Sequence, residues 1–287
     1  MGKNSFFSSN LFINTRGKLL DLSSPCIMSI LNLTPDSFYD GGSNSNPDKL
    51  LRKVETDLSL GAGILDLGAW SSRPGSIPIS VAQEWARLEP ALKNIRRNFP
   101  DAVISIDTYR AEIVTMAAAE GADMINDISA GNLDENMLGA VAKSGLPYVL
   151  MHMRGDSLTM KELNDYDDLL PDLSRFFRDT LEIVRQAGIT DIILDPGIGF
   201  SKKMNQSFEL LSRLTELKLF DLPILVGLSR KSMIAKLLNT DNAHALNGTT
   251  AAHMIALENK ASILRVHDVK EAAEAIKIFK TCKQFSA

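Results

Sequence analysis

Hydrophobic and polar positions alternate along this chain in a repeated order. A short apolar run ends on a polar residue, and an amphipathic stretch of helical length follows it. The apolar runs span about residues 27–32, 63–68, 103–107, 123–127, 147–152, 191–195, 223–227 and 262–266. Eight strand–helix units in succession predict a (β/α)8 TIM barrel, an α/β fold whose functional side chains lie where the parallel strands end.

The helices between these runs are predicted over about residues 47–61, 81–98, 110–120, 134–144, 167–187, 205–218, 243–258 and 268–282, with another beginning near residue 230. Long loops follow the first and second strands, at about 34–46 and 69–80. Residues 1–25 contain no strand–helix unit and predict a short hairpin around Thr15-Arg16-Gly17 that closes the floor of the barrel. We therefore expect an N-terminal extension over 1–25 and a barrel domain over 26–287.

Composition narrows the class of protein. A length of 287 residues suits one barrel, which needs about 250. The apolar fraction of 45% and the charged fraction of 23% are those of a soluble globular protein. A net charge of −4 gives no reason to expect nucleic acid or an anionic membrane as partner. The chain shows no membrane span and no signal-peptide core, and its two cysteines fit a reducing cytoplasm.

Three polar residues at strand ends predict an anion site. Arg265 and His267 are two positions apart on the last strand, so both side chains point to the same face. Arginine forks onto phosphate oxygens, and a neighbouring imidazole adds a donor. Asn32 ends the first strand, where its amide oxygen could hold a phosphate or a hydrated magnesium ion. Each alone could be an ordinary rim residue, but together they favour an anion site at the barrel mouth.

A second set of strand-end residues suits a flat polar heterocycle. The carboxylate of Asp195 can accept two parallel donors, such as the ring N–H and exocyclic amine of a pterin or guanine edge. Asn126 offers both a donor and an acceptor, and Lys231 offers a charge for a ring carbonyl. Asp107 lies near them in strand order, and Phe200 could cover the ring. The alternative is that these polar side chains pair with one another inside the barrel.

The remaining titratable residues are assigned less specific roles. His152 ends the fifth strand, but no metal-ligand spacing accompanies it, which favours a structural or supporting role. His244 and His253 lie in a late helical region and are interpreted as surface or packing residues. Asp66 could face inward and pair with an arginine or lysine.

Long motifs in a fixed order give the chain a resemblance to the dihydropteroate synthase family. The resemblance covers about residues 26–280. The motifs are ILNLTPDSFYDGG (30–42), LDLGAWSSRPGS (65–76), ISIDTYR, MINDISAG, LMHMRG, LDPGIGFSK, LVGLSRKSMI and LRVHDVKE. The resemblance implies a TIM-barrel transferase of folate biosynthesis that joins p-aminobenzoate to 6-hydroxymethyl-7,8-dihydropterin diphosphate. It also implies Mg²⁺, inhibition by sulfonamides, a cytoplasmic homodimer, and release of diphosphate with 7,8-dihydropteroate.

The same resemblance implies roles for individual residues. The catalytic residues would be Asp107, Lys231 and Arg73. The pterin site would comprise Asp107, Asn126, Met151, Asp195, Gly227 and Lys231. The diphosphate site would comprise Asn32, Arg73, Arg265 and His267, with Asn32 also on the metal. The p-aminobenzoate site would comprise Ser72, Arg73, Pro74, Phe200, Lys231 and Ser232.

One motif departs from the commoner family form GGESTRPG. Ala69 stands in place of glycine, Trp70 in place of glutamate, and Ser72 in place of threonine. Ser72 keeps the hydroxyl, whereas Trp70 loses a carboxylate that would anchor the loop. Two alternatives therefore stay open. A folate-dependent methyltransferase barrel also binds a pterin, but it would need neither the Ser-Arg-Pro-Gly loop nor the Arg265/His267 pair. A catalytically silent pterin-binding paralogue is suggested by Trp70 alone.

Overall fold

The computed structural model describes residues 11–34, 46–70 and 76–285. Its centre is an eight-stranded parallel sheet in the order β8-β7-β6-β5-β4-β3-β10-β9. A bridge between Leu194 and Ile224 joins the two ends of this order, so the sheet closes into a barrel. The strands are β3 (Cys26–Asn32), β4 (Ala62–Gly68), β5 (Val103–Asp107), β6 (Met124–Asp127), β7 (Tyr148–Met151), β8 (Ile192–Asp195), β9 (Leu225–Gly227) and β10 (Ile263–Val266).

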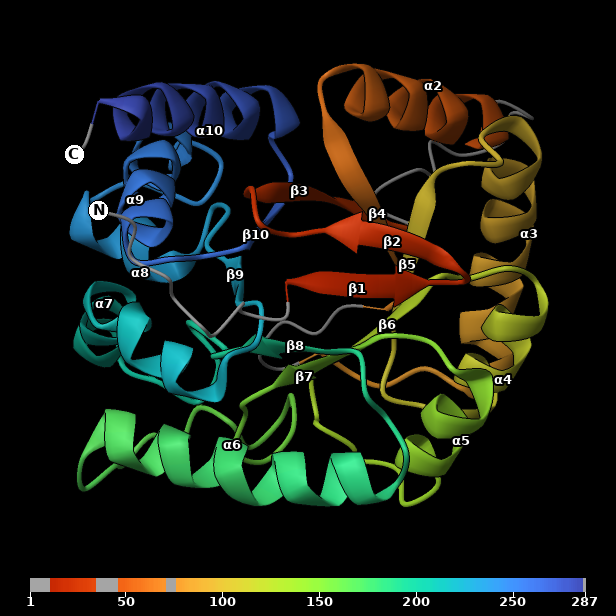
Figure 1. Cartoon of the computed structure of the whole chain (residues 1–287), viewed down its shortest axis with the longest axis horizontal. Coiled ribbons are helices and arrows are strands. Elements are labelled where there is room, and N and C mark those ends of the chain that lie inside the picture. Colours follow the sequence, from red (N-terminus) through yellow and green to blue (C-terminus); the bar gives the residue numbers. More distant parts are fainter. Residues whose placement is uncertain (1–10, 35–45, 71–75, 286–287) are drawn as a thin grey trace, which may run out of the picture.

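Helices surround the barrel as an outer ring (Figure 1). They are α2 (Asn46–Ser59), α3 (Val81–Asn98), α4 (Ala111–Ala119), α5 (Met137–Ser144), α6 (Leu169–Gln186), α7 (Met204–Ser212), α8 (Ser232–Leu237), α9 (Leu246–Glu258) and α10 (Val269–Gln284). The predicted (β/α)8 barrel is confirmed. The connections from β3 to α2 and from β4 to α3 are long, as predicted, although 35–45 and 71–75 lie outside the described residues.

The single helix predicted over 205–218 is wrong. Helix α7 ends at Ser212, and a 3-10 helix, η1, follows it over Leu214–Phe220. Leu214 and Leu217 are both fully buried, at a spacing of three residues. A 3-10 helix has three residues per turn, so it places residues three apart on the same side and keeps both leucines in the core.

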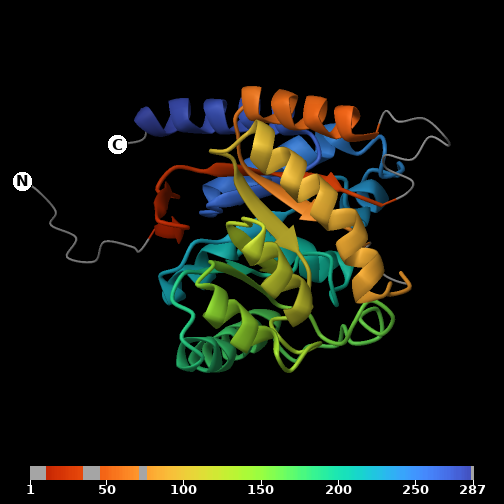
Figure 2. The ribbon, with the colours of Figure 1, turned by 90° about the vertical axis from the view of Figure 1, so that its right-hand side faces the viewer.

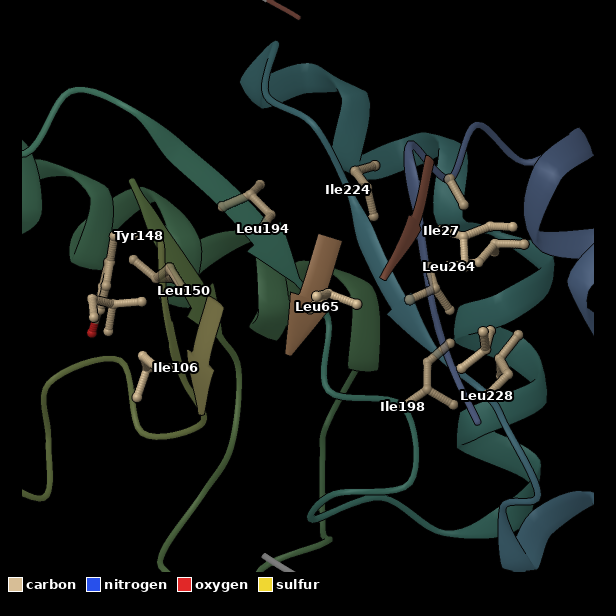
Figure 3. Packing of buried hydrophobic residues seen from close by; sticks show 14 of the residues in the cluster. Ile27, Leu65, Ile106, Tyr148, Leu150, Leu194, Ile198, Ile224, Leu228 and Leu264 are labelled. Carbon is tan, nitrogen blue, oxygen red and sulfur yellow. The ribbon is translucent and has the colours of Figure 1, made fainter. Parts of the chain in front are cut away.

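Side chains alternate between two cores along each strand. Those pointing outward pack under the helices, as Leu65, Ile106 and Leu150 do in Figure 3. Those pointing inward near the strand starts form a second, smaller cluster inside the barrel. This inner cluster contains Met28, Ile64, Met124, Val149, Ile193, Leu225 and Ile263. The period of two in a strand requires this division, and it makes the lower half of the barrel interior apolar.

A two-stranded hairpin closes the floor of the barrel, as the sequence predicts. It comprises β1 (Phe12–Thr15) and β2 (Lys18–Asp21), and it lies at one end of the barrel (Figure 2). Arg16 and Gly17 at its turn have φ of 51° and 82°, as a tight two-residue hairpin turn requires. Ile13 and Leu22 pack against the inner cluster. The active end must therefore be the opposite one, where the parallel strands finish.

Within the described part of the chain, no helix is long and apolar enough to cross a membrane.

Candidate active site

The strand period sets which residues reach the mouth of the barrel. Each position two residues after a member of the inner cluster points to the same interior face, one layer nearer the carboxyl ends of the strands. These positions are Ile30, Asp66, Asn126, Met151, Asp195, Gly227 and Arg265. Asp107 joins this layer because it pairs in register with Gly68 and with Asn126. The fold therefore brings together the strand-end residues that the sequence predicts for a heterocycle site.

Arg265 connects several of these residues in one buried network. Its Nε donates to Asp66 Oδ2 at 2.6 Å, and its second guanidinium nitrogen donates to Asp107 Oδ2 at 2.7 Å. Asn126 Nδ2 also donates to Asp66 Oδ2, at 3.1 Å. The prediction that Asp66 faces inward and pairs with a basic residue is confirmed. The pairing of polar side chains with one another, which the sequence offers as the alternative to ligand binding, is also present among Arg265, Asp66 and Asp107.

The charges in this network shift the ionisation of its members. Burial raises the pKa of Asp107 to about 7, partly opposed by Arg265 and assisted by the nearby Asp66. Burial acts to lower the pKa of Arg265, but Asp66 and Asp107 outweigh it and hold that pKa above its ordinary value. The guanidinium is therefore a permanent cation, whereas Asp107 changes charge near neutral pH.

Lys231 and Asp195 are close enough for each charge to affect the ionisation of the other, and both contact the loop that follows β8. Lys231 Nζ donates to the carbonyl of Ile198 and lies 4.6 Å from the centre of the Phe200 ring. Asp195 Oδ1 accepts from the backbone N–H of Gly197 at 2.7 Å. Burial lowers the pKa of Lys231 to about 8, opposed by the charge of Asp195. Burial likewise raises the pKa of Asp195, opposed first by Lys231.

Two predicted anion ligands, Asn32 and His267, lie at the ends of β3 and β10. A side chain at Gly68 would meet Asp107 Oδ2 at 3.6 Å and Asn32 Oδ1 at 3.8 Å, so both oxygens converge on this bare stretch of backbone. His267 follows β10, and its Nδ1 and backbone N lie 3.1 and 3.2 Å from Ser229 Oγ.

An apolar wall borders the polar layer. Trp70 is only 7% exposed, and its ring meets Tyr109 edge-on at 5.2 Å. It clusters with Met151 and two further methionines, and Phe200 packs against this cluster. Trp70 thus fixes the end of β4 by apolar contact at the position where the family motif carries a carboxylate. Ser232, the first residue of α8, is exposed beside Lys231.

Three of the predicted site residues cannot be placed, and one residue near the site was not predicted. Ser72, Arg73 and Pro74 lie outside the described residues. Sequence reasoning missed Lys202, whose ammonium contacts three backbone carbonyls and the His152 ring. The only sequence signal for it is its place at the end of the LDPGIGFSK motif. In the described ranges, no group of three or more His, Cys, Asp or Glu side chains has metal-site geometry.

Comparison with known proteins agrees with this geometry. The family described as "Pterin binding enzyme" matches residues 28–267. Dihydropteroate synthase of Escherichia coli K12 is 42% identical over 265 residues, which cover 92% of this chain and 93% of that protein. The crystal structure of Yersinia pestis dihydropteroate synthase with a sulfonamide drug has a TM-score of 0.89 and 42% identity, covering 95% of this chain and 99% of that one. A Xanthomonas albilineans dihydropteroate synthase structure with 4-aminobenzoic acid has a TM-score of 0.88 and 33% identity, covering 95% and 98%. The chain therefore belongs to the dihydropteroate synthase family of pterin-binding enzymes.

Proposed function

We propose that the mouth of this barrel is where the chain carries out the reaction of its family. As a dihydropteroate synthase of folate biosynthesis, it transfers a dihydropterinylmethyl group from diphosphate to the amine of p-aminobenzoate. The observation that carries the assignment to this site is the single layer that joins the buried Asp107, Asn126 and Asp195 with the partly buried Arg265. A flat ring with donors and acceptors on its edge matches such a layer.

The pterin ring is proposed to bind across this layer. Asp195 accepts from the ring N–H and the exocyclic amine, and Asn126 presents its amide to the adjacent edge. Lys231 faces the ring carbonyl, close enough to Asp195 for the two charges to stabilise each other. Met151 and Gly227 border the ring faces, the first by apolar contact and the second by leaving space. Each polar group replaces a contact with water by a contact with the substrate, as burial requires.

The diphosphate is proposed to lie between Asn32, Arg73, Arg265 and His267. Arg265 has one guanidinium nitrogen, Nη1, with no hydrogen bond to any described residue, although Asp66 and Asp107 hold the rest of the group. The proposed Mg²⁺ fits the oxygen donors here, because Asn32 Oδ1 and Asp107 Oδ2 converge on Gly68. Magnesium is commonly bound through one or two protein oxygens together with substrate phosphates. When bound, it would supply positive charge for the phosphate oxygens.

The chemical step is proposed to be a displacement at the exocyclic carbon of the pterin. The C–O bond to diphosphate breaks, and its electron pair leaves with the diphosphate, where Arg265 and His267 stabilise the growing charge. Asp107 stabilises the positive charge that the pterin ring shares. The amine of p-aminobenzoate then forms the new C–N bond and loses a proton. Ser72, Arg73, Pro74, Phe200, Lys231 and Ser232 would hold this second substrate, and sulfonamides would occupy the same place.

Further proposals concern the whole chain. Residues 26–287 would form the catalytic domain, with 1–25 as an extension that closes its floor, and the compartment would be the cytoplasm. The enzyme would be a homodimer through its late helices. Leu237 and Leu238 at the end of α8 and Ile255 on α9 support this, because they are 55%, 51% and 47% exposed. Sedimentation equilibrium tests the dimer, and a mass equal to one chain would exclude it.

The central test is direct. Incubation with dihydropterin diphosphate, p-aminobenzoate and magnesium should give dihydropteroate and diphosphate in equal amounts, and chelation of magnesium should abolish turnover. The competing silent paralogue would bind a pterin without forming product. Absence of product above a blank without enzyme would contradict the proposed activity.

A further inference from the structure

One partly buried lysine near the mouth has no role in the proposed chemistry. Lys202 lies at the end of the segment that follows β8, and its Nζ is held by acceptors from that segment and from His152. Its Nζ is 2.9 Å from His152 Nδ1, 3.0 Å from the carbonyl oxygen of Gly197 and 3.1 Å from that of Phe200. A fourth acceptor, the carbonyl of His152, is at 3.4 Å. Burial lowers the pKa of Lys202 well below its usual range, opposed by the charge of Asp195. In its ammonium form the side chain has three N–H donors, one for each of the three nearest acceptors.

These acceptors belong to two segments that touch each other. A Cβ placed on Gly197 would come within 2.1 Å of the His152 carbonyl oxygen, so only glycine permits this approach. The backbone N–H of His152 donates to the carbonyl of Asp195 at 2.9 Å. Lys202 therefore donates to both sides of the junction between the end of β7 and the loop after β8. Without the ammonium, the carbonyl oxygens that converge here would lose a shared donor.

His152 is built to hold this ammonium. Its ring is buried and meets Phe176 edge-on at 4.8 Å, so its orientation is fixed by packing. Burial lowers the pKa of His152 well below its usual range, and the charge of Lys202 adds to the effect. A neutral ring keeps one nitrogen as an acceptor, which is the role that Nδ1 needs toward a lysine donor.

The loop held in this way carries groups assigned to both substrates. Gly197 accepts from Lys202 through its carbonyl oxygen and donates its N–H to Asp195 Oδ1. The next carbonyl, from Ile198, accepts from Lys231, and the Phe200 ring lies under the Lys231 ammonium. Asp195 is the last residue of a strand and is held by the barrel itself. Phe200 is five residues farther along, within the loop, where its ring also packs against the Trp70 cluster.

We propose that Lys202, supported by His152, is a positioning residue that holds the loop of residues 196–203 in one conformation. This conformation presents Phe200 to the second substrate and keeps the Ile198 carbonyl against Lys231. The inference rests on the proposed placement of p-aminobenzoate against Phe200 and Lys231. It predicts an asymmetry, because loss of the ammonium affects the loop residue Phe200 more than the strand residue Asp195.

The test compares two adjacent lysines. Lys202→Met keeps the length and apolar stem of the side chain but removes its N–H donors. Lys203→Met is the matched control, since the exposed Lys203 side chain forms a surface ion pair with Asp165 at 3.6 Å and does not join the two segments that Lys202 joins. We expect Lys202→Met to raise the KM for p-aminobenzoate by about 10- to 100-fold, with a smaller rise for the pterin diphosphate. Lys203→Met should change neither KM.

A second readout reports on the loop without turnover. Hydrogen–deuterium exchange of the peptide covering 196–203 should become faster in Lys202→Met while the rest of the barrel keeps its exchange rates. The affinity of Lys202→Met for a sulfonamide, measured by calorimetry, should be lower than that of the wild type. Neither measurement needs catalysis, so a wild-type enzyme that forms no product would count against the proposed function and not against the positioning role.

The histidine supplies a variant pair in case Lys202→Met does not fold. His152→Phe keeps a ring in the aromatic surroundings but removes the acceptor, whereas His152→Asn restores an acceptor oxygen near the position of Nδ1. His152→Phe should reproduce the loss in KM and the faster loop exchange, and His152→Asn should recover part of both. Unchanged KM for p-aminobenzoate with unchanged exchange at 196–203, or exchange that rises uniformly over the barrel, would overturn the proposal.

Discussion

At the scale of single residues, Arg265 has two roles, because the side chain predicted to bind diphosphate also forms ion pairs within the protein. The guanidinium bonds two carboxylates, Asp66 and Asp107, that would otherwise be buried without a cation. Removing one partner of a buried ion pair costs about 3–5 kcal/mol, chiefly through the charge left behind. Arg265 therefore supports the pterin layer in addition to any diphosphate it binds.

We accordingly expect Arg265→Ala and His267→Ala to differ. Arg265→Ala should weaken binding of both the pterin diphosphate and a pterin alcohol that lacks the diphosphate. His267→Ala should weaken only the diphosphate ester, by about 10- to 100-fold, because a hydrogen bond to a charged group contributes roughly 1.5–3 kcal/mol. Calorimetric titration with both ligands measures the difference. Equal losses for the two ligands in His267→Ala would remove His267 from the anion site.

The pH dependence of the reaction should also follow from single groups. Asp107 must lose its proton to stabilise positive charge, and its pKa is raised to about 7 by burial. Lys231 must keep its proton, and its pKa is lowered to about 8 by burial. The value of kcat/KM should therefore rise with pH up to about 7 and fall above about 8. In Lys231→Arg the fall should disappear, because a guanidinium keeps its charge. Persistence of the same alkaline fall in Lys231→Arg would assign it to another group.

At the scale of elements, the sequence locates a strand or helix well where its hydrophobic pattern ends at a polar or capping residue. β5 (Val103–Asp107) and α3 (Val81–Asn98) match their predicted ranges, since apolar runs end at clear polar or capping residues. Ser80, for instance, accepts from the N–H of Gln83 and begins α3. The region after Ser212 is less predictable, because a three-residue apolar spacing is compatible with either kind of helix. The contacts of Lys202 could not be predicted from its place at the end of the LDPGIGFSK motif, because backbone carbonyls from separate segments leave no mark in the sequence.

Helix α9 contains a group that should make stability sensitive to acid. His253 is 2% exposed, and neither ring nitrogen has a hydrogen-bond partner among the described residues. Burial lowers its pKa from 6.5 to about 4, so the unfolded chain binds a proton more readily in this window. The free energy of unfolding should therefore fall as pH drops from 6.5 to about 4, by about 3 kcal/mol from this residue.

The variant His253→Phe should reduce this acid sensitivity, because it packs in the same place without a titrating group. Urea unfolding at several values of pH between 4 and 8 measures the slope. His152 contributes in the same direction, since burial also lowers its pKa, so some slope should remain. Identical slopes in the wild type and His253→Phe would contradict the burial of a neutral imidazole in α9.

At the scale of the whole molecule, the barrel separates stability from chemistry along its axis. The floor is apolar and closed by the hairpin, and the opposite end carries the polar layer. Sequence reasoning could predict this division because each strand passes from apolar residues to a polar tip. It could predict the residues in the polar layer, but not that Arg265 would pair with two of its carboxylates, since that depends on how three distant strands meet.

This separation predicts a variant that loses stability and keeps substrate affinity. Ile13 on β1 is 2% exposed and packs into the inner cluster, far from the carboxyl ends of the strands. Ile13→Ala should lower the free energy of unfolding by about 2–5 kcal/mol, the usual cost of such a truncation in a core. Phe12→Ala is its control, because Phe12 is the preceding residue on the opposite face of the same strand and is 49% exposed. That change should cost little, within about 0.5 kcal/mol. Both variants should keep the KM for each substrate, since the hairpin packs on the inner cluster at the end of the barrel opposite the polar layer. Denaturant unfolding and steady-state kinetics on the same preparations separate the two effects, and a raised KM in Ile13→Ala would show that the two ends of the barrel are coupled.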